Sequence, residues 1–142
     1  MQVKAILRNL RIAPRKTRDV IDLIRGKGAM EAQTALSFTT RKSAPIILKL
    51  LNSAIASAEN DFKLKKENLF VAKVFTDEGT KLKRWHPMSR GRAYPIEKRT
   101  SHITIVLDTL ENKIESKREI RKAKKKEFRI KRQNKKLNKK IK

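Results

Sequence analysis

Apolar and polar positions alternate at the start of the chain and then change to a helical period. In residues 3–10 apolar side chains recur at every second position, which predicts a β-strand with one polar edge. From Pro14 onward an apolar stripe at helical spacing predicts a helix over residues 14–25, stopped by Gly26.

Two further helices are expected in the first half of the chain. A short one covers residues 29–37, with Met30 and Leu36 among its apolar positions. The strongest helical pattern follows, because apolar residues recur at steps of three and four from 44 to 58. Residues 60–61 can end this helix.

Two apolar strands flank a basic segment later in the chain. Residues 69–76 are rich in valine and phenylalanine, and residues 103–107 alternate as their mate. Residues 79–100 hold seven basic side chains and one acidic one, with little to form a core. An antiparallel extension with its turn near 87–91 would reach roughly 30 Å beyond the body. Since an isolated two-stranded ribbon is marginal in water, we expect its order to come from what it touches.

Charge divides the 142 residues into a body and an appendage. Residues 1–110 carry 22 basic and 10 acidic groups, and 111–142 carry 16 and 4, within a net charge of +24. We therefore expect one globular domain over 1–110, with its hairpin at about 78–100, and a basic extension over 111–142. The extension has helix-forming composition, but the interpretation that we favour is a charged segment that is disordered until it binds a nucleic acid such as RNA. So large a surplus predicts a polyanionic partner, and nucleic acid is the first candidate.

Several functions are disfavoured by the sequence. The chain has no cysteine and only two histidines, so we expect no disulfide, no metal and no cofactor. His86 with Asp77 and Glu78 could suggest metal-dependent phosphodiester cleavage, but no third ligand has metal-site spacing, and we expect no catalysis. No apolar run approaches the roughly 18 residues of a membrane span, so a cytoplasmic protein without a membrane span is expected.

Cations, rings and close backbone approach occur together along the predicted hairpin. Basic side chains displace counterions from phosphates, and aromatic rings stack on unpaired bases. Trp85 could instead pack across the hairpin, and the cations near Pro14 could form a solvated helical face. The residues that we predict to contact RNA are Arg11, Arg15, Lys16, Arg18, Lys81, Lys83, Arg84, Trp85, Arg90, Arg92, Lys98 and Arg99.

Seven collinear motifs carry a resemblance to a known family. They lie at residues 10–16, 23–27, 51–56, 77–79, 82–84, 90–94 and 98–103. In order and spacing they are similar to large-subunit ribosomal protein twenty-two, over about residues 3–108. The resemblance implies an α+β fold in which three helices pack on a three-stranded antiparallel sheet with a long protruding β-hairpin.

The resemblance also implies partners and a role. The body would bind large-subunit ribosomal RNA beside neighbouring ribosomal proteins, support subunit assembly, and not form an obligate homo-oligomer. The hairpin tip would line the peptide exit tunnel, where the nascent peptide passes and macrolides bind nearby. Carried onto this chain, the tip comprises Pro87, Met88, Ser89, Arg90, Gly91 and Arg92.

The chain departs from the family pattern at a few positions. Ala13 replaces a usual serine cap, which would remove about 1 kcal/mol of helix capping. Pro95 and Glu97 stand at commonly basic positions, and Pro95 predicts a bulge or irregular pairing because it has no backbone N–H. Trp85 and His86 replace a more usual phenylalanine and basic residue.

A nucleoid architectural protein is the alternative reading of the same charge. Such a protein would bend duplex DNA with a basic β-arm, and Pro87 and Met88 could act as its apolar wedge. No obvious dimer surface supports it. A preference for structured ribosomal RNA over duplex DNA of equal charge would separate the two.

Overall fold

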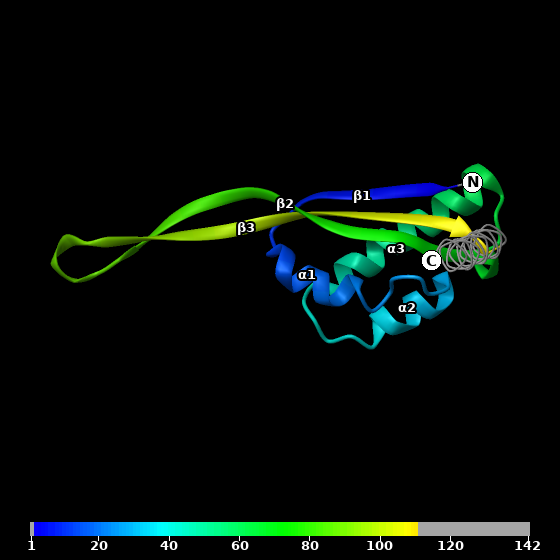
Figure 1. Cartoon of the computed structure of the whole chain (residues 1–142), viewed down its shortest axis with the longest axis horizontal. Coiled ribbons are helices and arrows are strands. Elements are labelled where there is room, and N and C mark those ends of the chain that lie inside the picture. Colours follow the sequence, from blue (N-terminus) through cyan, green and yellow to red (C-terminus); the bar gives the residue numbers. More distant parts are fainter. Residues whose placement is uncertain (1, 111–142) are drawn as a thin grey trace, which may run out of the picture. The chain divides into compact units, whose positions relative to one another are not determined.

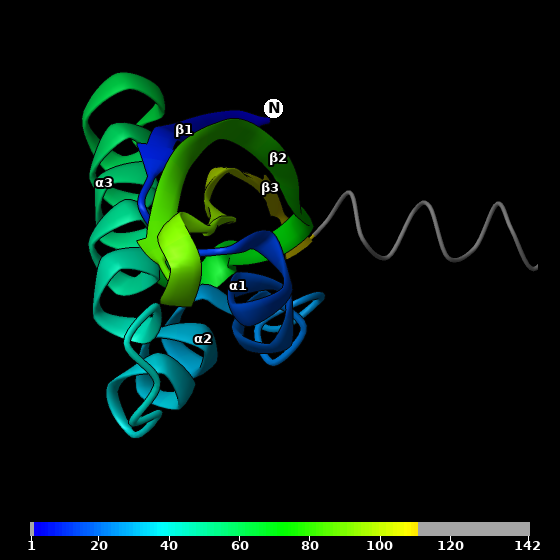
Figure 2. The same ribbon diagram turned by 90° about the vertical axis from the view of Figure 1, so that its left-hand side faces the viewer.

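The computed structural model describes residues 2–110, which form three helices on one side of an antiparallel sheet (Figures 1 and 2). This confirms the predicted α+β fold. The predicted extension over 111–142 lies outside the described residues. No helix within residues 2–110 is both long and apolar enough to cross a membrane.

In chain order the elements are β1 (Val3–Leu10), α1 (Pro14–Ile21), α2 (Ala29–Ser37), α3 (Ala44–Phe62), β2 (Leu69–Pro87) and β3 (Ala93–Thr109), with short 3-10 turns at Lys66–Asn68 and Ser89–Gly91.

The sheet has the order β1-β3-β2, so β3 is its central strand. β3 pairs with β1 between Ser101 and Leu107, and it pairs with β2 along almost its whole length. The β3 side chains that face the helices, Ile103, Ile105 and Leu107, are fully buried. They pack in one core cluster with the buried stripe of α3. The alternation expected in the first strand is confirmed, because Val3 is buried and its neighbour Lys4 is exposed.

The helices differ from the predictions at their ends. α1 stops at Ile21 rather than continuing to residue 25, and the chain tightens into turns in which the Ile24 N–H donates to the Ile21 carbonyl at 3.2 Å. Ile24 is nevertheless fully buried, because this turn keeps it on the core side. In α2 the expected apolar position Met30 is exposed. α3 runs past residues 60–61 and ends where Lys63 adopts a left-handed conformation with φ of 54°.

β2 and β3 continue past the body as a two-stranded hairpin (Figure 1). The strands are 19 and 17 residues long and pair as far as Pro87 with Ala93. The predicted hairpin and its turn near 87–91 are therefore confirmed. The predicted irregularity at Pro95 is wrong, since Pro95 lies opposite Trp85 without a register shift. Beyond the end of β1, β3 has a free edge, and a proline is tolerated in a strand where its nitrogen faces such an edge.

Irregularities flank β3 where the hairpin leaves the body. The β1 pairing shifts register between Leu7 and Leu10, and the β2 pairing shifts between Glu78 and Lys81. Asn9 has a φ of 55°, and its N–H donates to His102 Nδ1 at 3.0 Å. Bulges increase local twist and bend strands, so these two set the direction in which the hairpin departs.

Candidate nucleic-acid interface

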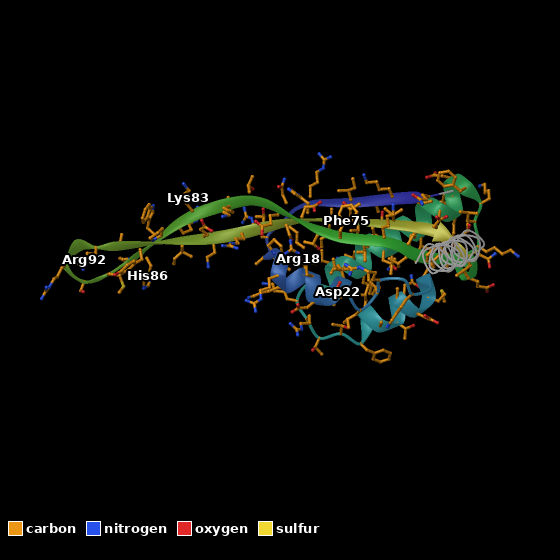
Figure 3. All side chains as sticks on the ribbon, in the orientation of Figure 1. Arg18, Asp22, Phe75, Lys83, His86 and Arg92 are labelled. Atoms are coloured by element: carbon orange, nitrogen blue, oxygen red, sulfur yellow. The ribbon has the colours of Figure 1, made fainter. Side chains whose placement is uncertain are left out.

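The hairpin presents its side chains to solvent along both strands. Trp85 has 66% of its surface exposed, and Tyr94 and Met88 are also exposed. Lys83, His86 and Arg92 lie along the part of the hairpin that extends away from the helices (Figure 3). Trp85 lies directly opposite Pro95, so the cross-strand neighbour expected for it is present, but it leaves most of the indole uncovered. An exposed ring next to a cation such as Arg84 is an arrangement that suits an unpaired base.

A basic groove lies where the hairpin meets the body. It has a volume of about 850 Å³ and combines the start of α1, the loop before α3 and the base of the hairpin. Seven cations and one acid, Glu97, line it, so its electrostatics favour an anion. We call this feature the basic groove. Its cations are Arg11, Lys16, Arg41, Lys42, Arg84, Lys98 and Arg99.

The basic groove brings together five residues that the sequence predicted from separate segments, and it adds two that were missed. Arg11 and Lys16 come from the region of α1, and the other three come from the hairpin. Arg41 and Lys42 were missed because they occupy a short loop with no helical or strand pattern. Their adjacency just before the strongest helix was the only available signal. The Arg41 guanidinium also pairs with Asp19 at 3.3 Å, which ties the loop to α1.

Glu97 has a structural reason to interrupt the basic arm. Lys81 and Arg99 lie directly opposite each other, where like charges repel. The Glu97 carboxylate accepts both, at 3.3 Å from Lys81 Nζ and 3.4 Å from an Arg99 guanidinium nitrogen. The hydrogen bond and charge of Lys81 hold the pKa of Glu97 below its ordinary value, with a smaller contribution from Arg99. Two predicted RNA-contacting cations therefore already share an acidic partner.

Arg18, which is predicted to contact RNA, also donates a hydrogen bond to the sheet. Its guanidinium donates to the Thr76 carbonyl at 3.4 Å, and the Arg25 guanidinium donates to the Val74 carbonyl at 3.3 Å. Both acceptors lie on β2, which is an edge strand of the sheet. Capping an exposed edge in this way opposes pairing with other chains. Arg15 is exposed on α1 and has no ion pair among residues 2–110.

The histidines and acids along the two long strands do not converge on one site. Asp77 lies opposite His102, whereas His86 lies opposite Tyr94. Nine residues of strand separate Asp77 from His86, which is about 30 Å. Among residues 2–110 no three side chains of metal-binding type are grouped as a metal site would require.

Comparison with known proteins gives one consistent result. The family model described as ribosomal protein L22p/L17e matches residues 5–108. The large ribosomal subunit protein uL22 of Phytoplasma sp. (strain STRAWB2) and that of Onion yellows phytoplasma (strain OY-M) are each 53% identical to this chain over 116 residues. That alignment covers 82% of this chain and 90% of each relative. The chain therefore belongs to the ribosomal protein L22p/L17e family.

Proposed function

We propose that the chain is a structural constituent of the large ribosomal subunit that binds ribosomal RNA and has no catalytic role. Family membership makes it a large-subunit ribosomal protein, located in the ribosomes of the cytoplasm. Its partners are ribosomal RNA and neighbouring ribosomal proteins, and it does not require a second copy of itself. The observation that carries the RNA contact is the basic groove, with seven cations at the base of an exposed hairpin.

The mechanism is charge neutralisation combined with geometric clamping. The body supplies a rigid groove wall, and the hairpin supplies the opposite wall from a continuous antiparallel ladder. RNA helices that approach each other closely repel through their phosphates, and cations from both walls relieve this repulsion. The protein thereby stabilises one relative position of the RNA segments and supports subunit assembly.

The hairpin tip is proposed to line the peptide exit tunnel. The tip consists of Pro87, Met88, Ser89, Arg90, Gly91 and Arg92, all of which are exposed. Supporting this role, the tip is a tight turn in which the Met88 N–H donates to the Arg92 carbonyl at 2.8 Å. Such a narrow end can enter a confined space in RNA. The alternative, a basic arm that bends DNA, is not favoured by family membership.

Phosphate contact in the basic groove can be tested by salt dependence. Replacing Lys42 and Lys98 together with alanine should lower the slope of log affinity against log salt by roughly 0.7–0.9 for each phosphate that is no longer neutralised. The matched control replaces Lys49 and Lys65, two exposed lysines outside the groove. Equal reductions from both pairs would refute a specific groove site. In cells, the wild-type chain should sediment with the large subunit at high salt, and its absence there would refute the proposed function.

The tunnel role needs a test of its own. A photoreactive amino acid at Met88 should crosslink to nascent peptides on stalled ribosomes, whereas the same group at Phe38 should not. Phe38 is the control because its side chain is 82% exposed just after α2, away from the hairpin. Crosslinks from both positions, or from neither, would remove the tip from the tunnel wall. Deleting residues 87–92 should also alter the response to tunnel-directed antibiotics.

A further inference from the structure

The sheet has a second face that none of the three helices described within residues 2–110 covers. The helices pack on the face that carries Ile103, Ile105 and Leu107 (Figure 2). Side chains alternate across a strand, so the intervening positions of β3 point to the other side. The register then defines two rows across that face, which are Lys4–Val106–Lys73 and Ile6–Thr104–Phe75. We call these two rows the outer sheet face.

On the outer sheet face, the side chains of the central strand are buried and the ring of Phe75 is partly exposed. Thr104 and Val106, on the central strand, are almost completely buried by their neighbours. Phe75 and Ile6, on the flanking strands, keep 42% and 43% of their surface exposed. Phe75 lies in the body of the sheet, far along β2 from the hairpin tip (Figure 3). A phenylalanine held on a rigid strand with its ring half exposed can accept a flat ligand without rearrangement.

Cations share the face with this ring. Lys4 and Lys73 both lie opposite Val106, one row from Phe75. Lys73 is on the same strand as Phe75 and about 7 Å away, whereas Lys4 is on β1, two strand spacings of about 4.8 Å further across the sheet. Arg8 follows Ile6 by two positions and so shares its face. Within residues 2–110 none of these three cations has an ion pair. Two acids share this face. Asp77 follows on β2 in the next row, opposite His102, and Asp108 lies two positions after Val106 on β3, where it is buried and accepts from the Gln2 side-chain amide at 3.1 Å.

We infer that the outer sheet face binds a single-stranded segment of RNA, with an unpaired base stacked on Phe75 and its phosphates near Lys4 and Lys73. Sheets recognise single-stranded RNA by stacking bases on exposed aromatic side chains while cations hold the backbone. Charge complementarity favours RNA over a protein partner, because an apolar protein contact would leave the three unpaired cations without partners. The inference rests on the proposed RNA-binding function and adds a site separate from the basic groove and the hairpin.

The chain contains its own control for the ring. Phe38 is more exposed than Phe75 and lies just after α2, outside both the outer sheet face and the lining of the basic groove. If any exposed phenylalanine aided RNA binding through non-specific apolar contact, Phe38 would do so at least as well. A stacking site predicts that only Phe75 matters. Leucine is the replacement at both positions because it preserves apolar contact and removes the aromatic face.

The experiment compares a 20-nucleotide oligouridylate with an RNA duplex that has the same number of phosphates. Phe75→Leu in the full chain should weaken binding to the single strand about tenfold, within the range of base–aromatic stacking. Its salt slope and its affinity for the duplex should not change. Phe38→Leu should change neither affinity. Replacing Lys4 and Lys73 with alanine should lower the single-strand salt slope by about 1.4.

Further outcomes overturn the inference or separate it from the proposed function. Phe75→Trp retains an aromatic face and should bind the single strand at least as well as the wild type, which excludes misfolding as the cause. Equal effects of Phe75→Leu and Phe38→Leu would overturn the inference. If Phe75→Leu binds both RNAs normally but fails to enter the large subunit, the face is a protein contact instead. If the Lys42 and Lys98 variants still flatten the salt slope while Phe75→Leu has no effect, the proposed function stands and this inference fails.

Discussion

Gly79 occupies the most confined glycine position in the described chain, at the β2 bulge where the hairpin leaves the body. A Cβ atom there would lie 2.4 Å from Thr100 Oγ1 and 3.1 Å from His102 Nε2. Carbon contacts are favourable near 3.5–4.0 Å, so Gly79→Ala requires a displacement of about 1 Å. The Thr100 hydroxyl cannot move freely, because it donates to the Thr80 carbonyl at 2.8 Å.

The expected loss of stability follows from three contributions. Overpacking costs about 1–3 kcal/mol, and losing the Thr100 hydrogen bond costs about 0.5–1.5 kcal/mol. Alanine offsets about 0.5–1 kcal/mol of this through its lower entropy cost in a strand. We therefore expect Gly79→Ala to reduce the free energy of unfolding by about 2 kcal/mol, within a range of about 0.5–4 kcal/mol. Thr100→Ala alone should cost the hydrogen bond and the smaller packing contribution of its buried methyl group.

Urea denaturation followed by circular dichroism measures these changes, and the double variant isolates their cause. Removing Thr100 Oγ1 makes room for the new Cβ, so Gly79→Ala with Thr100→Ala should lose less stability than the sum of the two single variants. Recovery should be incomplete, because His102 Nε2 stays close. The control is Gly28→Ala, whose Cβ would have its nearest contact at 3.9 Å and should cost below about 1 kcal/mol. Additive losses, or a Gly79 variant as stable as the control, would refute the steric reasoning.

Three other changes have defined outcomes. Ala13→Ser should stabilise the chain by about 1 kcal/mol, seen as a rise in Tm of about 4–8 °C, because α1 has no side-chain cap. Glu97 has a pKa below its ordinary 4.5, so its stabilising contribution is present above about pH 4.5 and is lost as the pH falls through the lowered pKa. In an NMR titration, Lys81→Met should return this pKa toward 4.5 more than Arg99→Met does, and the reverse order would contradict the assignment. Removing residues 111–142 should weaken RNA affinity and flatten its salt dependence, and an unchanged salt slope would show that this segment makes no phosphate contact.

The elements most accurately predicted from sequence are those whose pattern is long. The apolar stripe from 44 to 58 belongs to α3, and the paired apolar strands place the hairpin between them. The hairpin was recognisable because residues 79–100 lack core-forming side chains yet lie between two strands that must pair. Where two paired strands have no core residues beyond them, they either end or continue outward as a hairpin. Pro87 and Gly91 favour a turn far from the apolar strands, which indicated that the pairing continues outward.

Local signals failed where tertiary contacts decide the outcome. Pro95 predicted a bulge, but the bulge forms at Gly79, because a position without a Cβ permits close approach to Thr100. The sequence predicts the end of α1 too late, because the buried positions keep a helical spacing as far as Ile24 although the helix itself stops at Ile21. The basic groove could be predicted only in part, since Arg41 enters it through the packing of α3 against the body.

Net charge predicts a polyanionic partner, but it does not say which cations are available to bind it. Arg18 and Arg25 donate to carbonyls on the outer edge of β2, and Lys81 shares the Glu97 carboxylate with Arg99. Arg18 and Arg25 supply hydrogen bonds to the edge strand, and Glu97 reduces the repulsion between the facing charges of Lys81 and Arg99. Both situations arise only when the sheet forms. Groups such as Lys98 have no such partner within the described residues, so phosphate can bind them without displacing an internal contact. The fold thus divides one basic composition into cations that stabilise the protein and cations that remain free for RNA.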